Sequence, residues 1–236
     1  MSHRARRSKG QSIVEFAFVV PIFLLMVFGL IDFSRLLFSY ISLASSTREF
    51  ARHAAISSST NANAAVNAFN NYTLVGSSFS PATTVRVQPT SGGVVTCTSI
   101  TSSGCELNVV GSASGGTVTL QLTPASGNAS GAITTTLPEN SWNPRALFTA
   151  SNTGDFMVIT VLDRLYDGKV KICPLPLSTT CVLPDRAAST DGVLQADTYY
   201  TFNFSPLFQN RLSGVIDAFF MRPLSSVSTS ARTYIE

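Results

Sequence analysis

Glu15 stands near the start of an apolar run, and it is the residue of this 236-residue chain whose place most clearly implies chemistry. The run continues to Ile31 and follows ten residues that include four Lys or Arg. An ionisable side chain costs roughly 2.5–3.5 kcal/mol at the centre of a bilayer, so one in a membrane segment usually has a partner or a task. We therefore interpret Glu15 as a residue that has a partner or a task in the membrane.

Motifs for catalysis are missing from the sequence. It has no phosphate-binding Gly-rich loop with Lys and Ser/Thr, no His-Glu-x-x-His, and no Gly-x-Ser-x-Gly elbow, since Ala113 occupies the nucleophile position of Gly111–Gly115. His53 is the single histidine outside the first ten residues, and it lies in a helical pattern without an evident partner. We do not expect an enzyme. The carboxylates of the C-terminal half are interpreted as turn residues and solvated faces: Asp155, Asp163, Asp167, Asp185, Asp191 and Asp197.

The apolar run has the length of a membrane span. The 19 residues from Ile13 to Ile31 rise about 28 Å as a helix, enough to cross the hydrocarbon core. Arg4, Arg6, Arg7 and Lys9 keep the N-terminal side in the cytoplasm by the positive-inside rule. The prediction is a single-pass protein of the cytoplasmic (inner) membrane, in contact with lipid, whose chain after Asp32 is extracytoplasmic.

Several motifs together resemble one family. They are Gly10–Ala17, Pro21, Gly29–Arg35 and Arg48–Arg52, and they are similar to the TadE-like pseudopilins of the tight-adherence (Tad, Flp) type IV pilus system. The resemblance implies that a prepilin peptidase cuts between Gly10 and Gln11. It also implies partners, namely other pilins and pseudopilins of the Tad system and the inner-membrane assembly platform, and a place in the extracellular pilus.

The same resemblance gives Glu15 and Phe16 a role in assembly. Gln11 and Glu15 lie four residues apart, about 6 Å of helical rise, near the boundary between headgroups and hydrocarbon. Cleavage would make the amino group of Gln11 a cation at this depth, and in assembled pilins its implied partner is the glutamate of a neighbouring subunit. Two alternatives are an uncut signal anchor in which Glu15 reaches the headgroups, and a secretory signal peptide cut after Ala44. The apolar run is too long for the second.

Charge also depends on the first ten residues. They hold four of the 16 Lys and Arg and none of the 13 Asp and Glu, so cleavage at Gly10 would change the net charge from +3 to 12 − 13 = −1. The basic isoelectric point of about 8.8 then belongs mainly to the removed segment. The sequence therefore gives no support for a nucleic-acid partner.

We expect four segments: a leader at 1–10, a membrane helix at 11–32, an amphipathic extension of the helix at 33–57, and an extracytoplasmic β-rich domain at 58–236. Pro21 is expected to bend or locally unwind the helix. In the extension we expect an apolar face and a polar face. The apolar face is Phe33, Leu36, Leu37, Tyr40, Leu43, Ala44, Thr47, Phe50, Ala51 and Ala54; the polar face is Ser34, Arg35, Ser42, Ser45, Ser46, Glu49 and Arg52.

The fold class predicted is α+β, a long N-terminal helix followed by a mainly β domain that ends in a strand, a helix from about Pro206 to Phe220, and a strand. A short helix is expected near 62–72, a hairpin turn at Asp167-Gly168, and loops at the Gly- and Ser-rich stretches 91–93, 111–116 and 126–131. Alternation and β-branched content predict strands at 85–88, 94–98, 107–110, 117–122, 156–162, 170–173, 198–204 and 226–235.

The cysteines are expected to form disulfides. Cys97 and Cys105 are separated by seven residues, as are Cys173 and Cys181. Outside the cytoplasm two local disulfides are the simplest pairing, although four cysteines allow three connectivities and one that joins the two halves stays open. No Cys-x2-Cys motif is present, so neither a metal nor another cofactor is expected.

Two functions from different classes fit these observations. The first is a processed pseudopilin or minor pilin that assembles through its N-terminal helix. The second is an uncut, membrane-tethered β domain that recognises a surface ligand. Gly10 with Glu15 favours the first, because a tether needs neither residue. Aromatic residues of the domain are interpreted as core and rim in preference to a binding face: Trp142, Tyr199, Tyr200, Phe202 and Phe204.

Overall fold

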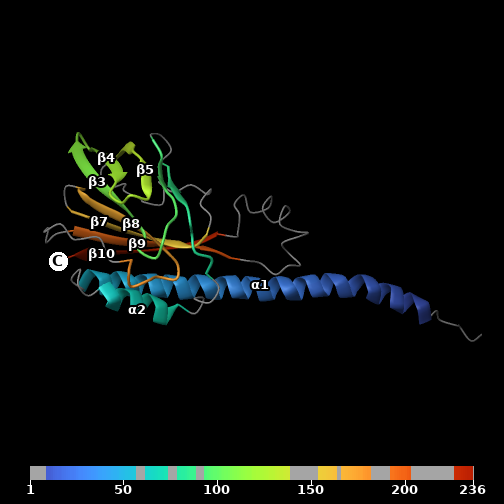
Figure 1. Ribbon diagram of the computed structural model, residues 1–236. Coiled ribbons are helices and arrows are strands. Elements are labelled where there is room, and N and C mark those ends of the chain that lie inside the picture. The colour runs from blue at the N-terminus through green and yellow to red at the C-terminus, as the bar shows by residue number, and fades with distance from the viewer. Residues whose placement is uncertain are drawn as a thin grey trace, which may run out of the picture.

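The computed structural model confirms an α+β protein in which a long helix precedes a mainly β domain (Figure 1). The residues that the structure describes are 9–56, 62–73, 79–88, 93–138, 154–163, 166–181, 192–202 and 226–235. The expected late helix at 206–220 lies outside them, as do Trp142, Phe204, Asp185 and Asp191.

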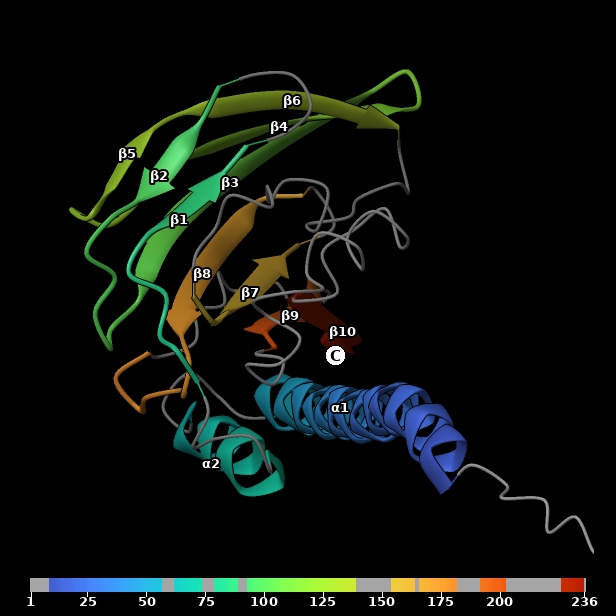
Figure 2. The same cartoon turned by 90° about the vertical axis from the view of Figure 1, so that its right-hand side faces the viewer.

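Helix α1 spans Lys9–Ile56, and α2 spans Ala62–Tyr72 where a short helix was predicted. α1 continues without a break through Pro21, so no unwinding occurs there, and Figure 2 shows its N-terminal end bent away from the axis of the rest. α2 lies beside the C-terminal part of α1, where the rings of Phe50 and Phe69 meet edge to face at 6.5 Å.

Within the described ranges, ten strands form two antiparallel sheets. A seven-stranded sheet has the order β10-β9-β7-β8-β3-β4-β6, and a three-stranded sheet has the order β1-β2-β5. The strands are β1 Val85–Val87, β2 Val95–Cys97, β3 Cys105–Ser114, β4 Thr117–Pro124, β5 Ala129–Gly131, β6 Ile133–Pro138, β7 Phe156–Leu162, β8 Gly168–Pro174, β9 Gly192–Thr201 and β10 Ser226–Ile235. Figure 2 shows the large sheet curling away from the helices, which lie below β9 and β10.

All eight predicted strands exist, but the loop predictions were partly wrong. Residues 111–114 extend β3, and 129–131 form β5, while β6 was not predicted. The reason is a long hairpin whose turn needs only two residues. Gly115 and Gly116 have φ values of 59° and 78°, which L side chains rarely adopt, and they connect paired Ser114 and Thr117.

The β7–β8 hairpin was predicted at Asp167-Gly168, and it closes there with Leu162 opposite Gly168. The loop is longer than a two-residue turn. The Asp167 N–H donates to Asp163 Oδ1 at 2.8 Å, and the Asp163 N–H donates to the Asp167 carbonyl at 2.8 Å. Asp167 Oδ1 also accepts a 2.7 Å hydrogen bond from the Gly111 N–H. These two carboxylates are turn residues, as expected.

Two hydrophobic cores lie on opposite faces of β7, which is buried along its whole length. We call them the helix-side core and the outer core. The helix-side core packs α1 and α2 against the sheet through residues that include Leu43, Phe50, Ala51, Ala54, Phe69, Met157, Ile159, Leu175, Leu194, Ala196, Tyr200 and Phe202. The outer core packs the three-stranded sheet against the large one through residues that include Val85, Val87, Val95, Leu107, Val109, Leu120, Leu122, Ile133, Phe156, Val158, Val170 and Ile172.

The four cysteines form the two local disulfides. Cys97–Cys105 joins β2 to the start of β3 within the outer core, and Cys173–Cys181 joins β8 to the segment after it within the helix-side core. Both bonds close a sequence separation of 8 residues with Cα atoms 6.1 Å apart. Each core therefore has one crosslink of the same loop size.

Candidate functional site: the N-terminal helix and its seat on the sheet

The residues predicted to be processed lie at the start of α1. Gly10 and Gln11 belong to its first turn, and Glu15 follows one turn after Gln11. Glu15 and Phe16 have exposed side chains, Phe16 at 69%. An 18-residue apolar window makes this helix a candidate membrane span, and none of that window is buried by the described residues of the chain. The exposed apolar part of the helix is therefore suited to contacts outside its own domain.

From Asp32 onward one side of α1 is buried against the domain. The apolar positions Leu43, Phe50, Ala51 and Ala54 are buried as predicted. Thr47 is buried as well, and Ser34, Arg35, Ser45 and Arg52 of the polar face are exposed, but other parts of the predicted division were wrong. Ser42 and Ser46, assigned to the polar face, are buried with Ser39, whereas Phe33, Leu37 and Tyr40, assigned to the apolar face, are exposed.

Small hydroxyl residues explain how this side of α1 can be buried although it is partly polar. The Ser39 hydroxyl donates to the Arg35 carbonyl at 2.9 Å, and the Ser46 hydroxyl donates to the Ser42 carbonyl at 2.8 Å. Such bonds satisfy the hydroxyl within the helix, so the residue can be buried without water. Ser39 and Ser46 share the buried side of α1 with the larger Leu43 and Phe50.

Thr47 is the polar centre of the helix–sheet contact. Its hydroxyl donates to the Leu43 carbonyl at 2.7 Å and lies 2.8 Å from the Thr198 hydroxyl and 2.9 Å from the Thr229 hydroxyl. These two threonines come from the neighbouring strands β9 and β10. All three are buried, so the cluster fixes the position of α1 along the sheet.

At its membrane-proximal end the contact contains charge. Asp32 is 5% exposed, and its Oδ1 lies 3.8 Å from Nη1 of Arg35, which is mostly exposed. Tyr200 of β9 is buried in the same region. Burial raises the pKa of its hydroxyl, the charge of Asp155 raises it further, and the charge of Arg35 lowers it. Asp32 was not singled out by sequence reasoning, which treated it only as the end of the span.

Asp155 is a buried carboxylate that holds three segments together. Its Oδ2 accepts a 2.7 Å hydrogen bond from the Ser80 N–H, and its Oδ1 accepts a 2.6 Å hydrogen bond from the Thr201 N–H. Its carbonyl accepts from the N–H groups of Ala82 and Leu175. Burial raises the pKa of Asp155, against the lowering effect of the two backbone donors.

The solvated-face interpretation was wrong for Asp155 and Asp197, which are both 0% exposed. Asp197 Oδ2 accepts a 2.9 Å hydrogen bond from Nε2 of the buried Gln195. Isolated carboxylates in a sequence give no signal for such burial, because the backbone donors that satisfy Asp155 come from residues 46 and 75 positions away.

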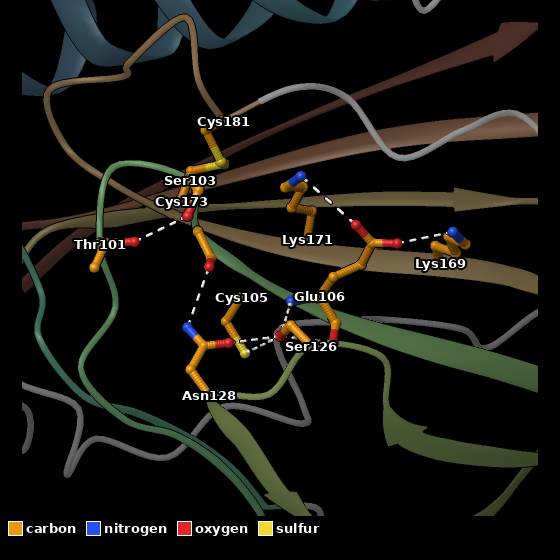
Figure 3. A network of polar contacts seen from close by, with 11 residues as sticks. Thr101, Ser103, Cys105, Glu106, Ser126, Asn128, Lys169, Lys171, Cys173 and Cys181 are labelled. Atoms are coloured by element: carbon orange, nitrogen blue, oxygen red, sulfur yellow. Dashed lines mark hydrogen bonds and ion pairs between the residues drawn. A yellow bond between two sulfur atoms is a disulfide. The ribbon is translucent and has the colours of Figure 1, made fainter.

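Glu106 on β3 forms an ionic group with two lysines of β8 (Figure 3). Its Oε1 lies 2.8 Å from Nζ of Lys169, and its Oε2 lies 3.6 Å from Nζ of Lys171. Burial raises the pKa of Glu106, but the hydrogen bonds and charges of the two lysines outweigh it and hold the pKa below 4.5. The group stabilises the β3–β8 pairing and has the features of a structural ion pair.

No group of three His, Cys, Asp or Glu side chains suited to a metal ion occurs within the residues that the structure describes. Of the aromatic residues considered, Tyr200 and Phe202 are buried, and Tyr199 stacks on Phe156 with ring centroids 4.7 Å apart. These three belong to the core, as predicted. The remaining feature with the properties of an interaction site is α1.

The fold and this helix define a class of protein: a β-rich domain on a single N-terminal apolar helix, which fits a single-pass membrane protein. Residues 10–52 match the family model described as TadE-like protein. This match confirms the resemblance to the TadE-like family, whose members are components of the Tad pilus system. No curated protein and no solved structure matches the chain.

Proposed function

We propose that this chain is a processed pilin-like subunit, a pseudopilin or minor pilin, that takes part in the assembly of a Tad/Flp-type pilus through α1. The observation that carries the proposal is the division of one unbroken helix into two parts. Within the described residues, none of the 18-residue apolar window of the first part is buried, and the second part contributes Leu43, Phe50, Ala51 and Ala54 to the helix-side core. A force on the first part is therefore transmitted to the domain without a hinge.

The family match supports the same proposal. It starts at Gly10 and ends at residue 52, so it covers the proposed cleavage site, the apolar segment and the seat on the sheet. In the proposal, a prepilin peptidase cuts before Gln11, and the new amino group pairs with Glu15 of a neighbouring subunit. The N-terminus of the precursor is cytoplasmic, the domain is extracytoplasmic, and the other partners are Tad pilins and the inner-membrane assembly platform.

Processing is tested by N-terminal and intact-mass analysis of the protein from host membranes. The proposal expects a mature species that begins at Gln11 and disappears in Gly10→Ala. Gly29→Ala is the matched control, because it makes the same change in the same helix away from the junction. A full-length chain in the parent protein would contradict the proposal and favour an uncut, tethered recognition domain.

Assembly is tested separately with Glu15→Gln, which keeps the size of the side chain and removes its charge. The expected protein is cut normally but is depleted from sheared pilus fractions and from crosslinked complexes with other pilins. Glu49→Gln is the control, since Glu49 lies on the same helix 34 positions further along and within the domain region. Equal incorporation of both variants would remove Glu15 from the assembly contact.

A further inference from the structure

The outward side of α1 stays apolar beyond the predicted end of the membrane span. Exposed fractions there are 55% for Phe33, 45% for Leu37, 54% for Phe38, 49% for Tyr40 and 62% for Ile41. We call this set the outward face. It lies on the part of α1 whose other side, from Asp32 through Ser39 to Leu43, is buried against the domain.

Charges do not interrupt the outward face. Between Glu15 and Arg48 the sequence has only two charged residues, Asp32 and Arg35. Asp32 is buried on the domain side and lies 3.8 Å from Arg35. The carboxylate that seemed to end the span in the sequence is therefore shielded by the domain, and it does not set the depth at which the outward side of the helix leaves lipid.

Polar groups at this level are also satisfied without water. The exposed Ser34 hydroxyl donates to the Leu30 carbonyl at 2.8 Å, and the buried Ser39 hydroxyl donates to the Arg35 carbonyl. A helix surface with internally bonded hydroxyls is compatible with an apolar or interfacial environment.

The length of the apolar side matches a whole bilayer. Ile13 to Ile41 covers 29 residues, about 42 Å of helical rise. The hydrocarbon core is about 30 Å thick, and the bilayer is about 40–45 Å thick with its interfacial layers. If the hydrocarbon core begins at Ile13, the outward face occupies the next 12 Å or so on the domain side, which reaches through the outer interfacial layer of about 5–8 Å.

We propose that the outward face contacts lipid in the outer interfacial layer, so that the domain sits directly on the membrane surface. Phe33, Phe38 and Tyr40 have the aromatic character of interfacial belts. The mostly exposed Arg35 supplies a cation at the depth of lipid phosphates. Because α1 is buried on one side from Asp32 onward, this depth brings the part of the chain that covers Asp32 to the headgroups.

The inference does not depend on cleavage or on the proposed pilus function, since it concerns the chain while it is in the membrane. The competing occupant of the outward face is a helix of a second copy. Lipid and a second copy are distinguished by the reagent that reaches the outward face. Oxygen dissolved in lipid reaches a lipid-facing surface, a water-soluble paramagnetic ion reaches a surface in water, and neither reaches a surface covered by a second copy.

The test uses full-length protein in vesicles of phosphatidylcholine and phosphatidylglycerol, with one spin label at a time. All four native cysteines are in disulfides, so an introduced cysteine is the only thiol available for labelling. Labels at Leu37 and Ile41 report the outward face. Labels at Arg48 and Arg52, exposed on α1 further from the membrane, and at Val110, a 53% exposed apolar residue of β3, are controls.

The proposal expects labels at Leu37 and Ile41 to be relaxed more by oxygen than by a nickel chelate, and the order to be reversed at Arg48, Arg52 and Val110. Greater relaxation by nickel at Leu37 and Ile41 would overturn it. Low access to both reagents, increasing as the protein is diluted in lipid, would overturn it in favour of a second copy. The same measurement is made on Gly10→Ala, the variant that the processing proposal expects to stay uncut. An unchanged accessibility pattern in that variant would show that the lipid contact does not depend on processing.

Discussion

The helix-side core and the outer core share β7 but are built from segments at very different distances along the chain. In the outer core, Phe156 and Val158 of β7 pack against hairpins that lie mostly between residues 82 and 133. The helix-side core needs contacts across 151 and 182 positions, as in the Thr47 pairs with Thr198 and Thr229. The second half of α1 is therefore part of a core whose other members lie far along the chain.

This difference shows that the second half of α1 is part of the domain. Removing a tether leaves its domain intact, whereas removing the second half of α1 would expose Met157, Ile159 and Leu194. Among the described residues, the buried members of the outer core include none from α1, so we expect its strands to depend less on the helix. The predictions below test whether the two cores respond independently.

The largest expected effect comes from cavities. Phe50→Ala in the helix-side core and Leu107→Ala in the outer core each remove a fully buried side chain, which typically costs about 3–5 and 2–5 kcal/mol. Hydrogen exchange should accelerate in α1, β9 and β10 for Phe50→Ala, and in β3 and β4 for Leu107→Ala. Identical exchange patterns would show that β7 couples the cores into one unit. Phe38→Ala, at a 54% exposed site, is the control for side-chain size.

The disulfides give a matched pair of smaller perturbations. Both close a separation of 8 residues, so chain entropy predicts a loss of about 2.5 kcal/mol for replacing either pair by serine. Denaturant unfolding of the two double variants should give similar losses, with local exchange raised in the outer core for Cys97/Cys105 and in the helix-side core for Cys173/Cys181. A much larger loss for one pair would mean that its core carries more of the folding free energy.

Thr47→Val tests the polar centre of the helix–sheet contact. It keeps the shape of the side chain but leaves the Thr198 and Thr229 hydroxyls without that partner, which should cost about 1–2 kcal/mol. The loss should appear in thermal unfolding and in exchange of the last turns of α1. Thr117→Val is the control, since its hydroxyl bond to the Ser114 carbonyl is exposed. If Thr47→Val leaves the stability unchanged, the position of α1 on the sheet depends on apolar packing alone.

The smallest expected effect is a pH dependence confined to the β3–β8 pairing. The pKa of Glu106 is lowered in the folded chain, so this group contributes stability above its ordinary pKa of 4.5 and loses it as the pH falls through the lowered value. Glu106→Gln should cost less than about 1 kcal/mol at neutral pH, as expected for a partly exposed ion pair. Its deficit relative to the parent should shrink as the pH falls below 4.5 and disappear once the pH is below the lowered folded value, and a deficit that persists there would indicate lost packing instead.

Local sequence signals predicted much of the fold. The α+β class, the long helix, α2, eight strands and the β7–β8 hairpin follow from periodicity, β-branched content and turn residues, all of which act over a few positions. β6 was missed because its Ile-Thr-Thr-Thr-Leu-Pro sequence is short and carries a proline. The Gly-rich end of β3 was missed because a long hairpin overrides the weak strand propensity of glycine and serine.

The candidate site was predicted only along the chain. The order of leader, apolar helix and Glu15 is a linear pattern, and the family match over residues 10–52 has the same linear character. The faces of α1 were not predictable in this way, since hydrophobicity assigned Phe33, Leu37 and Tyr40 to the inside. Ser39 and Ser46 can be buried there because their hydroxyls are hydrogen-bonded to carbonyl groups of the helix itself.

The sequence by itself determined that the chain has one apolar helix of membrane length, a β-rich domain after it, and a Gly10–Glu15 arrangement similar to TadE-like proteins. The tertiary structure decided which side of α1 is covered, that Asp32, Asp155 and Asp197 are buried, and that the helix belongs to the core. The physical reason is the distance along the sequence over which the interactions act. Helix and strand patterns depend on neighbours in sequence, whereas burial of a particular face or carboxylate depends on partners more than 40 positions away.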